Sequence, residues 1–135
     1  MESRDIISEL DDSQLQTLIK CIDADGDKNL LLKFTATWCK PCQSVAQICQ
    51  DGFSNIPSNA IIAVIDIDEA LDLYMLLKRK RMLTGIPCIL SWYPEIDRDY
   101  DKWYIPNDSV LSSSKPDHLS FFERAKSKAD TIKKT

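Results

Sequence analysis

Two cysteines separated by two residues are the part of this chain best suited to chemistry. They lie in the stretch Trp38-Cys39-Lys40-Pro41-Cys42, which follows the apolar run at 30–34 and precedes a helical pattern. A first sulfur at the start of a helix meets unpaired N–H groups and the positive end of the helix dipole, and both favour the thiolate. A thiolate at Cys39 would attack a disulfide, and Cys42 would then displace the product from the mixed disulfide. The motif therefore predicts thiol–disulfide exchange.

Composition and charge indicate a folded protein that does not bind nucleic acid. The 135 residues are 44% hydrophobic and 28% charged, as in an ordinary globular chain, and we expect a single domain over 1–135. The formal charge of −4 argues against a nucleic-acid partner, because phosphate binding needs a basic surface.

The cysteine count and the N-terminus bear on the compartment. The five cysteines are an odd number with no paired framework, which fits a reducing compartment. Residues 1–5 lack the basic-then-apolar layout of a signal peptide, and no apolar run approaches the length of a membrane span. We expect a cytoplasmic protein with no membrane partner.

Alternating strands and helices are predicted around the cysteine motif. Strands are expected at 6–7, 30–36, 60–67, 88–93 and 103–105. Helices are expected after a cap at Asp12 or Ser13, over 39–51, over 69–83 and from near Pro116 onwards. The last helix should turn the following residues inward: Leu119, Phe122, Ala125, Ala129 and Ile132. The stretch 94–115 is polar and rich in turn residues.

A second motif, Gly85-Ile86-Pro87, follows the W-C-x-P-C stretch later in the chain. Together the two motifs resemble the thioredoxin family. The resemblance implies an α/β, thioredoxin-like fold: a central mixed sheet flanked by helices, with an atypical segment between the third sheet strand and the C-terminal helix. It also implies a cis bond between Ile86 and Pro87. The loop of Gly85, Ile86 and Pro87 would lie beside the dithiol and bind the extended client peptide, while Trp38 and Pro41 would shape the site.

Two lysines depart from the usual pattern of that family. Lys33 lies six residues before Cys39, where thioredoxins usually carry a buried acid that helps to move a proton. A buried lysine could act as a base or favour a nearby thiolate, whereas a lysine at a strand edge could extend its ammonium to water, and both interpretations stay open. Lys40 replaces a common glycine, and its charge should favour the thiolate of Cys39 and make the disulfide more oxidising.

The remaining cysteines have simpler interpretations. Cys88 directly follows Pro87 and is a candidate additional thiol, with an inert buried thiol as the alternative. Cys49 shares a helix face with Cys42 and is expected to be a small, buried, apolar residue. One C-x-x-C and the distant His118 do not supply four zinc ligands, so we expect no metal.

The resemblance implies a protein disulfide reductase that works through Cys39 and Cys42 without a metal or an organic cofactor. Its partners would be protein disulfides and either an upstream reductase or glutathione, and the chain would act as a monomer. A glycine that the family carries on its client-facing loop has no clear counterpart at 108–114, which favours a restricted set of clients. Two alternatives stay open: a disulfide oxidase or isomerase, and an adaptor that binds protein partners without catalysis.

Overall fold

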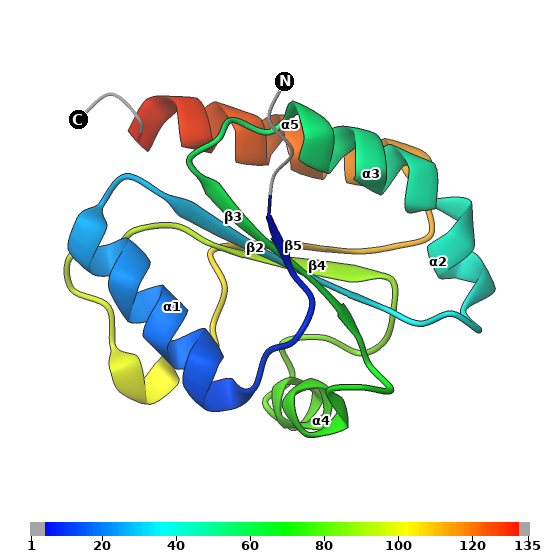
Figure 1. The fold of residues 1–135 in the computed structure, drawn as a ribbon, viewed down its shortest axis with the longest axis horizontal. Coiled ribbons are helices and arrows are strands. Elements are labelled where there is room, and N and C mark those ends of the chain that lie inside the picture. Colours follow the sequence, from blue (N-terminus) through cyan, green and yellow to red (C-terminus); the bar gives the residue numbers. More distant parts are fainter. Residues whose placement is uncertain (1–4, 133–135) are drawn as a thin grey trace.

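A five-stranded sheet forms the centre of the computed structural model, which describes residues 5–132 (Figure 1). Its strands are β1 (Ile6–Ile7), β2 (Asn29–Thr35), β3 (Ala60–Asp66), β4 (Cys88–Trp92) and β5 (Asp108–Leu111). They lie in the order β1-β3-β2-β4-β5, with the first three parallel and the last two antiparallel to their neighbours. The mixed sheet expected from the sequence is confirmed. The stretch 1–4, where we expect no signal peptide, lies outside the described residues.

Helices cover both faces of this sheet. One face carries α1 (Asp12–Asp25) and α4 (Leu71–Arg79), and the other carries α3 (Ala46–Asn55) and α5 (Lys115–Ile132), as Figure 1 shows. The short α2 (Lys40–Ser44) lies between β2 and α3 in the chain. Within 5–132, no helix combines the length and the apolar character that a membrane crossing needs.

Strand β2 is buried on both faces, which is what its continuous apolar sequence predicts. Leu30, Leu32 and Phe34 pack into the core cluster on the side of α1 and α4. Leu31 packs into the second cluster, with residues of α3 and α5. Lys33 continues the Leu31 side by the alternation of a strand, so a charged residue enters the α3–α5 side of the core.

Three local predictions are wrong. The helix expected over 39–51 is two helices, α2 and α3, which meet at Val45. Residues 103–105 do not form a strand, because the carbonyl of Trp103 accepts a hydrogen bond from the buried indole Nε1–H of Trp92 at 3.0 Å. Leu119, expected to face inward, is exposed, and the neighbouring His118 is fully buried instead.

The carboxylate of Asp23, in α1, binds the segment that follows β4 at three residues: Glu95, Arg98 and Tyr100. Arg98 donates to Asp23 from Nε at 2.7 Å and from Nη2 at 3.1 Å, and both side chains are about 5% exposed or less. The Tyr100 hydroxyl and the Glu95 N–H donate to the same carboxylate at 2.8 and 2.9 Å. This contact holds the turn of Tyr100–Lys102 beside α1, at the opposite end of the molecule from α2 (Figure 1).

We expect Asp23→Asn to destabilise the protein by about 3 kcal/mol in urea unfolding, because it leaves the buried Arg98 with only a longer contact, at 3.5 Å, to the exposed carboxylate of Glu95. Burial raises the pKa of Asp23, but the hydrogen bonds from Arg98, Glu95 and Tyr100 outweigh it and hold that pKa below its usual value. The wild type should therefore keep this stabilisation above about pH 4 and lose it as the pH falls further. The matched control is Asp25→Asn, whose exposed pair with Lys28 should contribute under about 1 kcal/mol. Equal losses for both variants would contradict the buried contact.

Helices α3 and α5 approach closely at Gly52. A Cβ atom built on Gly52 would lie 2.5 Å from ring atoms of Phe122. The same ring makes an edge-to-face contact with Phe53, with centroids 5.1 Å apart. A glycine is therefore needed here for packing, although it lies within a helix.

We expect Gly52→Ala to destabilise the protein by about 1–3 kcal/mol, because the ring of Phe122 must move to admit the methyl group. In an open helix the same change would stabilise by about 1 kcal/mol, so the sign of the effect is diagnostic. Gly85→Ala is the control, because no atom lies within 4 Å of the position that its methyl group would take. A gain in the thermal midpoint for Gly52→Ala would contradict the close approach.

Candidate active site: a dithiol at the edge of the sheet

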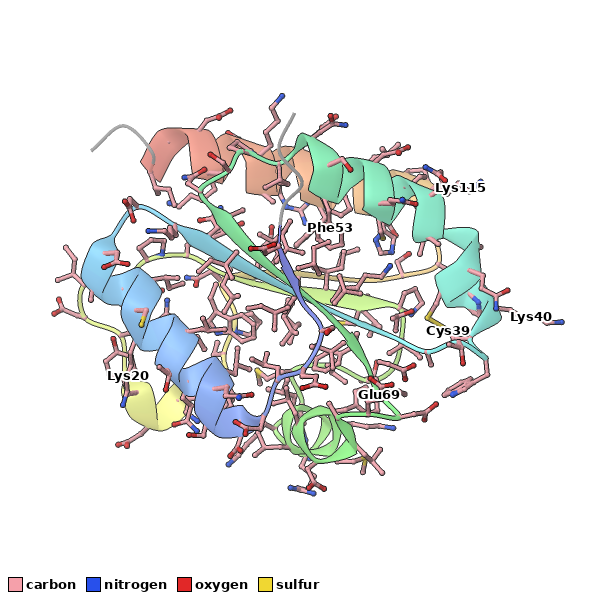
Figure 2. All side chains as sticks on the ribbon, viewed as in Figure 1. Lys20, Cys39, Lys40, Phe53, Glu69 and Lys115 are labelled. Atoms are coloured by element: carbon pink, nitrogen blue, oxygen red, sulfur yellow. A yellow bond between two sulfur atoms is a disulfide. The ribbon has the colours of Figure 1, made fainter. Side chains whose placement is uncertain are left out.

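The predicted motifs meet where β2 ends. β2 and β3 run parallel, and Thr35 pairs with Asp66 at their C-terminal ends. β4 runs in the opposite direction, and its first residue, Cys88, pairs with Phe34. The segments that follow β2 and β3 and the loop that precedes β4 therefore leave the sheet at the same end of its strands. Figure 2 shows Cys39 at this end of the molecule.

The two cysteines of the motif are joined as a disulfide. Cys39 and Cys42 have their Cα atoms 5.2 Å apart. Cys39 is the N-cap of α2, and its Sγ accepts a hydrogen bond from the Cys42 N–H at 3.2 Å. In the reduced state this N–H and the N-terminal end of the helix would stabilise a thiolate on Cys39. The first sulfur therefore lies where the sequence predicts the nucleophile.

The residues of the motif that flank the two cysteines are exposed. The Trp38 side chain is 62% exposed, and its Nε1–H donates to Asp68, just after β3, at 2.9 Å. This bond fixes the indole over the edge of the site. Lys40 is exposed and points outward in Figure 2, and Pro41 follows it in the first turn of α2. Pro is tolerated there because its missing N–H has no helical partner to lose.

The loop of Gly85, Ile86 and Pro87 has the arrangement that the resemblance implies. The Ile86–Pro87 peptide bond is cis. Pro87 is buried, while Gly85 and Ile86 are partly exposed. Because Cys88 pairs with Phe34, this loop lies across the sheet edge from the segment that carries the dithiol.

Lys33 is buried in the middle of the sheet. Its residue is 7% exposed, and β2 lies between β3 and β4, so Lys33 is not at a sheet edge. Its sheet neighbours are Val64 and Ile89, which are both apolar. This placement favours the interpretation of Lys33 as a buried lysine over that of a side chain extended to water from a strand edge.

Two further residues near Lys33 have a polar contact that the sequence does not predict. Cys49 Sγ lies 3.6 Å from His118 Nδ1, and both residues are buried. Burial raises the pKa of Cys49, and the nearby ammonium of Lys33 opposes that rise. Cys49 is thus small and buried as predicted, but it has polar partners. The inward spacing of Cys49 is visible in the sequence, whereas its approach to a residue of α5 is not.

Cys88 lies on the other face of the sheet. It is 1% exposed and packs in the core cluster that contains Phe34 and Tyr74. Burial raises the pKa of Cys88 to about 12, which keeps it a thiol at neutral pH. This favours the packing role over the role of an additional reactive thiol. Over residues 5–132 we find no group of three or more His, Cys, Asp or Glu side chains placed to hold a metal ion.

Comparisons with known proteins place the chain in one family. The family model described as thioredoxin matches residues 8–92, which include the dithiol and the loop at 85–87. The thioredoxin of Echinococcus granulosus is 31% identical over 85 residues, covering 63% of this chain and 70% of that protein. The chloroplastic thioredoxin-like protein CITRX of Arabidopsis thaliana is 30% identical over 96 residues, covering 70% of this chain. The chain spans about half the length of the CITRX relatives it matches, 48% in the Arabidopsis case.

Solved structures agree on the fold. The thioredoxin of Malassezia sympodialis superposes with a TM-score of 0.63 at 15% identity, over 93% of this chain and 97% of that one. The reduced thioredoxin pre-protein of Schistosoma mansoni gives a TM-score of 0.61 at 19% identity, over 90% and 98%. The family match stops at Trp92, just before the atypical segment. Because that match covers more than half of the chain and contains both motifs at the sheet edge, this chain belongs to the thioredoxin family.

Proposed function

We propose that this chain is a thiol–disulfide oxidoreductase that reduces protein disulfides through Cys39 and Cys42. The observation that carries the proposal is the dithiol at the start of α2, across the sheet edge from the loop that contains the cis Ile86–Pro87 bond. The thiolate of Cys39 attacks one sulfur of a client disulfide, forms a mixed disulfide and releases the other client sulfur as a thiolate. Cys42 then attacks the Cys39 sulfur and releases the second client thiol. Two electrons pass to the client, and the chain is left as a disulfide.

Each residue of the site has a proposed part in this reaction. Trp38 and Pro41 shape the surface around the sulfur atoms. The backbone at Gly85, Ile86 and Pro87 binds the extended client peptide. The exposed indole of Trp38, held by Asp68, extends the contact surface beside the dithiol.

The two lysines tune the stability of the thiolate. Lys40 is exposed, so its charge is screened by water and salt and its influence on Cys39 should be modest. Lys33 is buried, and a charge in the interior acts more strongly because the effective dielectric constant there is lower. We propose that Lys33 favours the thiolate of the dithiol or takes part in proton transfer during resolution.

A disulfide oxidase or isomerase is the second candidate, and the same two lysines favour it. Cations that stabilise the thiolate stabilise the reduced form, which makes the disulfide more oxidising. The two functions differ in the reduction potential of the Cys39–Cys42 couple: a low potential belongs to a reductase and a high one to an oxidase.

The proposed setting is a reducing compartment, such as the cytoplasm. Cys21, Cys49 and Cys88 are free thiols, which a reducing compartment preserves. We propose that the chain works as a monomeric thioredoxin-like domain over 1–135 on a restricted set of protein disulfides. An upstream reductase or glutathione would return it to the dithiol, and neither nucleic acid nor a membrane would take part.

Cys39→Ser should abolish insulin-disulfide reduction with dithiothreitol as electron donor, because it removes the attacking sulfur. We expect a loss of at least about 100-fold relative to the wild type, since covalent catalysis cannot proceed without the nucleophile. Cys21→Ser is the matched control, because this exposed cysteine lies on α1, away from the dithiol, and its loss should leave the rate unchanged. Equal, negligible rates for the wild type and Cys39→Ser would instead favour the non-catalytic adaptor.

Cys42→Ser should trap clients as mixed disulfides on Cys39, because the resolving thiol is absent. The measurement is non-reducing electrophoresis and mass spectrometry of a cell lysate passed over the immobilised variant. The double variant Cys39→Ser, Cys42→Ser is the control and should capture nothing that a reductant releases. Recovery of no reductant-sensitive clients by Cys42→Ser would contradict exchange with protein disulfides.

A further inference from the structure

Three polar side chains from three different elements converge in the core between the sheet and the pair α3 and α5. They are Lys33 of β2, Cys49 of α3 and His118 from the first turn of α5. Their residues are 7%, 1% and 0% exposed. The apolar residues that surround Cys49 on this face include Leu31, Val45, Ile89, Val110 and Phe121. The fully buried Asn29 and Ser91 lie on the same side of the sheet, where Asn29 donates to the Ala125 carbonyl of α5.

The hydrogen-bond partners define the protonation of the His118 ring. Nε2 lies 2.7 Å from the carbonyl oxygen of Ser112, which can only accept, so Nε2 carries the proton. In the neutral ring Nδ1 then has a lone pair, and Cys49 Sγ lies 3.6 Å from it. The Cys49 S–H donates to Nδ1 of this neutral ring, and the sulfur lone pairs accept from Lys33, whose side chain hydrogen-bonds to Cys49.

Lys33 has no acidic partner to balance its charge. Across residues 5–132, no Asp or Glu oxygen lies within 4.0 Å of its Nζ. β3 and β4 bring Val64 and Ile89 beside it, and β5 brings Val110 beyond Ile89. The titratable group that contacts it is Cys49 from α3, and the other face of that thiol meets His118 from α5. A buried cation needs such polar partners, because an unpartnered one is costly in the interior.

Cys49 also lies close to the dithiol along the chain. The Val45 N–H donates to the carbonyl of Cys42 at 3.3 Å, and the Cys49 N–H donates to the carbonyl of Val45 at 3.0 Å. Cys49 is therefore on the helical turns that directly follow Cys42. Lys33 lies near the end of β2, the strand that leads into Cys39. Lys33 and Cys49 therefore lie on the two chain segments that directly precede and directly follow the dithiol.

We propose that Cys49 and His118 are positioning residues that hold the ammonium of Lys33 inside the core, where its charge favours the thiolate of the dithiol. The inference rests on the proposed dithiol chemistry. Ser112 orients the ring of His118, the ring accepts from Cys49, and the Cys49 sulfur accepts from Lys33. Without this chain of contacts the flexible lysine side chain would turn toward water, where its charge is screened.

The first test is the pH dependence of Cys39 alkylation in the reduced protein, followed on the Cys39 peptide by mass spectrometry. Lys33→Met should raise the midpoint, because it removes a cation that favours the thiolate. Cys49→Ala and His118→Phe should each raise it by about half a pH unit, which is about a threefold loss of reactivity below the midpoint. Cys21→Ser is the matched control: it removes a free, exposed thiol of α1 that belongs to neither core cluster and should leave the midpoint unchanged.

A double variant separates positioning from a direct effect. In the Lys33→Met background, Cys49→Ala should cause no further shift, because its effect acts through Lys33. Cys49→Ser should restore the wild-type midpoint, because a hydroxyl can still donate to Nδ1 and accept from the ammonium. An undiminished shift in the Lys33→Met background, or the same shift in Cys21→Ser, would overturn the proposal.

A measurement on the wild type does not depend on any variant folding. Long-range ¹H–¹⁵N correlation spectra of the ring should show His118 as the Nε2–H tautomer, with Nδ1 as the acceptor. The Nδ1–H tautomer would overturn the assignment of Cys49 as the donor and His118 as the acceptor. Neither test needs turnover, so a chain that shows both results but fails to reduce insulin would contradict the proposed function and leave this inference standing.

Discussion

The pairing of β2 with both β3 and β4 is the constraint on which the rest of the structure depends. The parallel register with β3 brings the end of β2 beside Asp66, and the antiparallel register with β4 places Cys88 opposite Phe34. Three segments distant in sequence therefore leave the sheet at one edge. A one-residue slip of β2 would also move its side chains to the opposite face and bring Lys33 to the α1–α4 side. The same register thus fixes both the end of the sheet where the dithiol lies and the face of the sheet on which Lys33 lies.

Burial on both faces gives β2 its rigidity and also gives Lys33 its unusual setting. A lysine in a central strand loses its hydration and must be partnered by whatever the covering helices supply. Here α3 supplies the thiol of Cys49 in place of a carboxylate, and α5 supplies the His118 ring that contacts this thiol. The charge that we infer for Lys33 lies in the core, on the strand that leads into the dithiol. That charge distinguishes this chain from a thioredoxin with an acid at the same strand position.

The sequence predicts the elements whose signals are local. Long apolar runs locate β2, β3 and β4 to within a residue or two, and the spacing of the two cysteines locates the start of α2. The break at Val45 carries no such signal, because the helical pattern continues across it. A strand is predicted at 103–105 because aromatic residues are common in strands. In the structure, the Trp103 carbonyl accepts a hydrogen bond from the buried indole of Trp92 instead.

Local sequence signals predict only part of the candidate site. Cys39, Cys42 and Pro87 are recognised from short motifs. The group of Lys33, Cys49 and His118 depends on how α5 packs against α3, and no local pattern encodes that contact. Asp23 is a similar case: it lies near the end of α1, and only the fold shows that it binds Arg98, 75 residues later in the chain.

The reduction potential of the Cys39–Cys42 couple tests the account most directly. The reduced and oxidised forms would be equilibrated in dithiothreitol buffers of graded potential and the free thiols counted. A reductase should show one two-electron transition, from the three free thiols of the disulfide form to all five cysteines, at a potential more negative than that of the glutathione couple. A transition at a more positive potential would contradict the reductase function, and the absence of any two-thiol transition would contradict disulfide exchange itself.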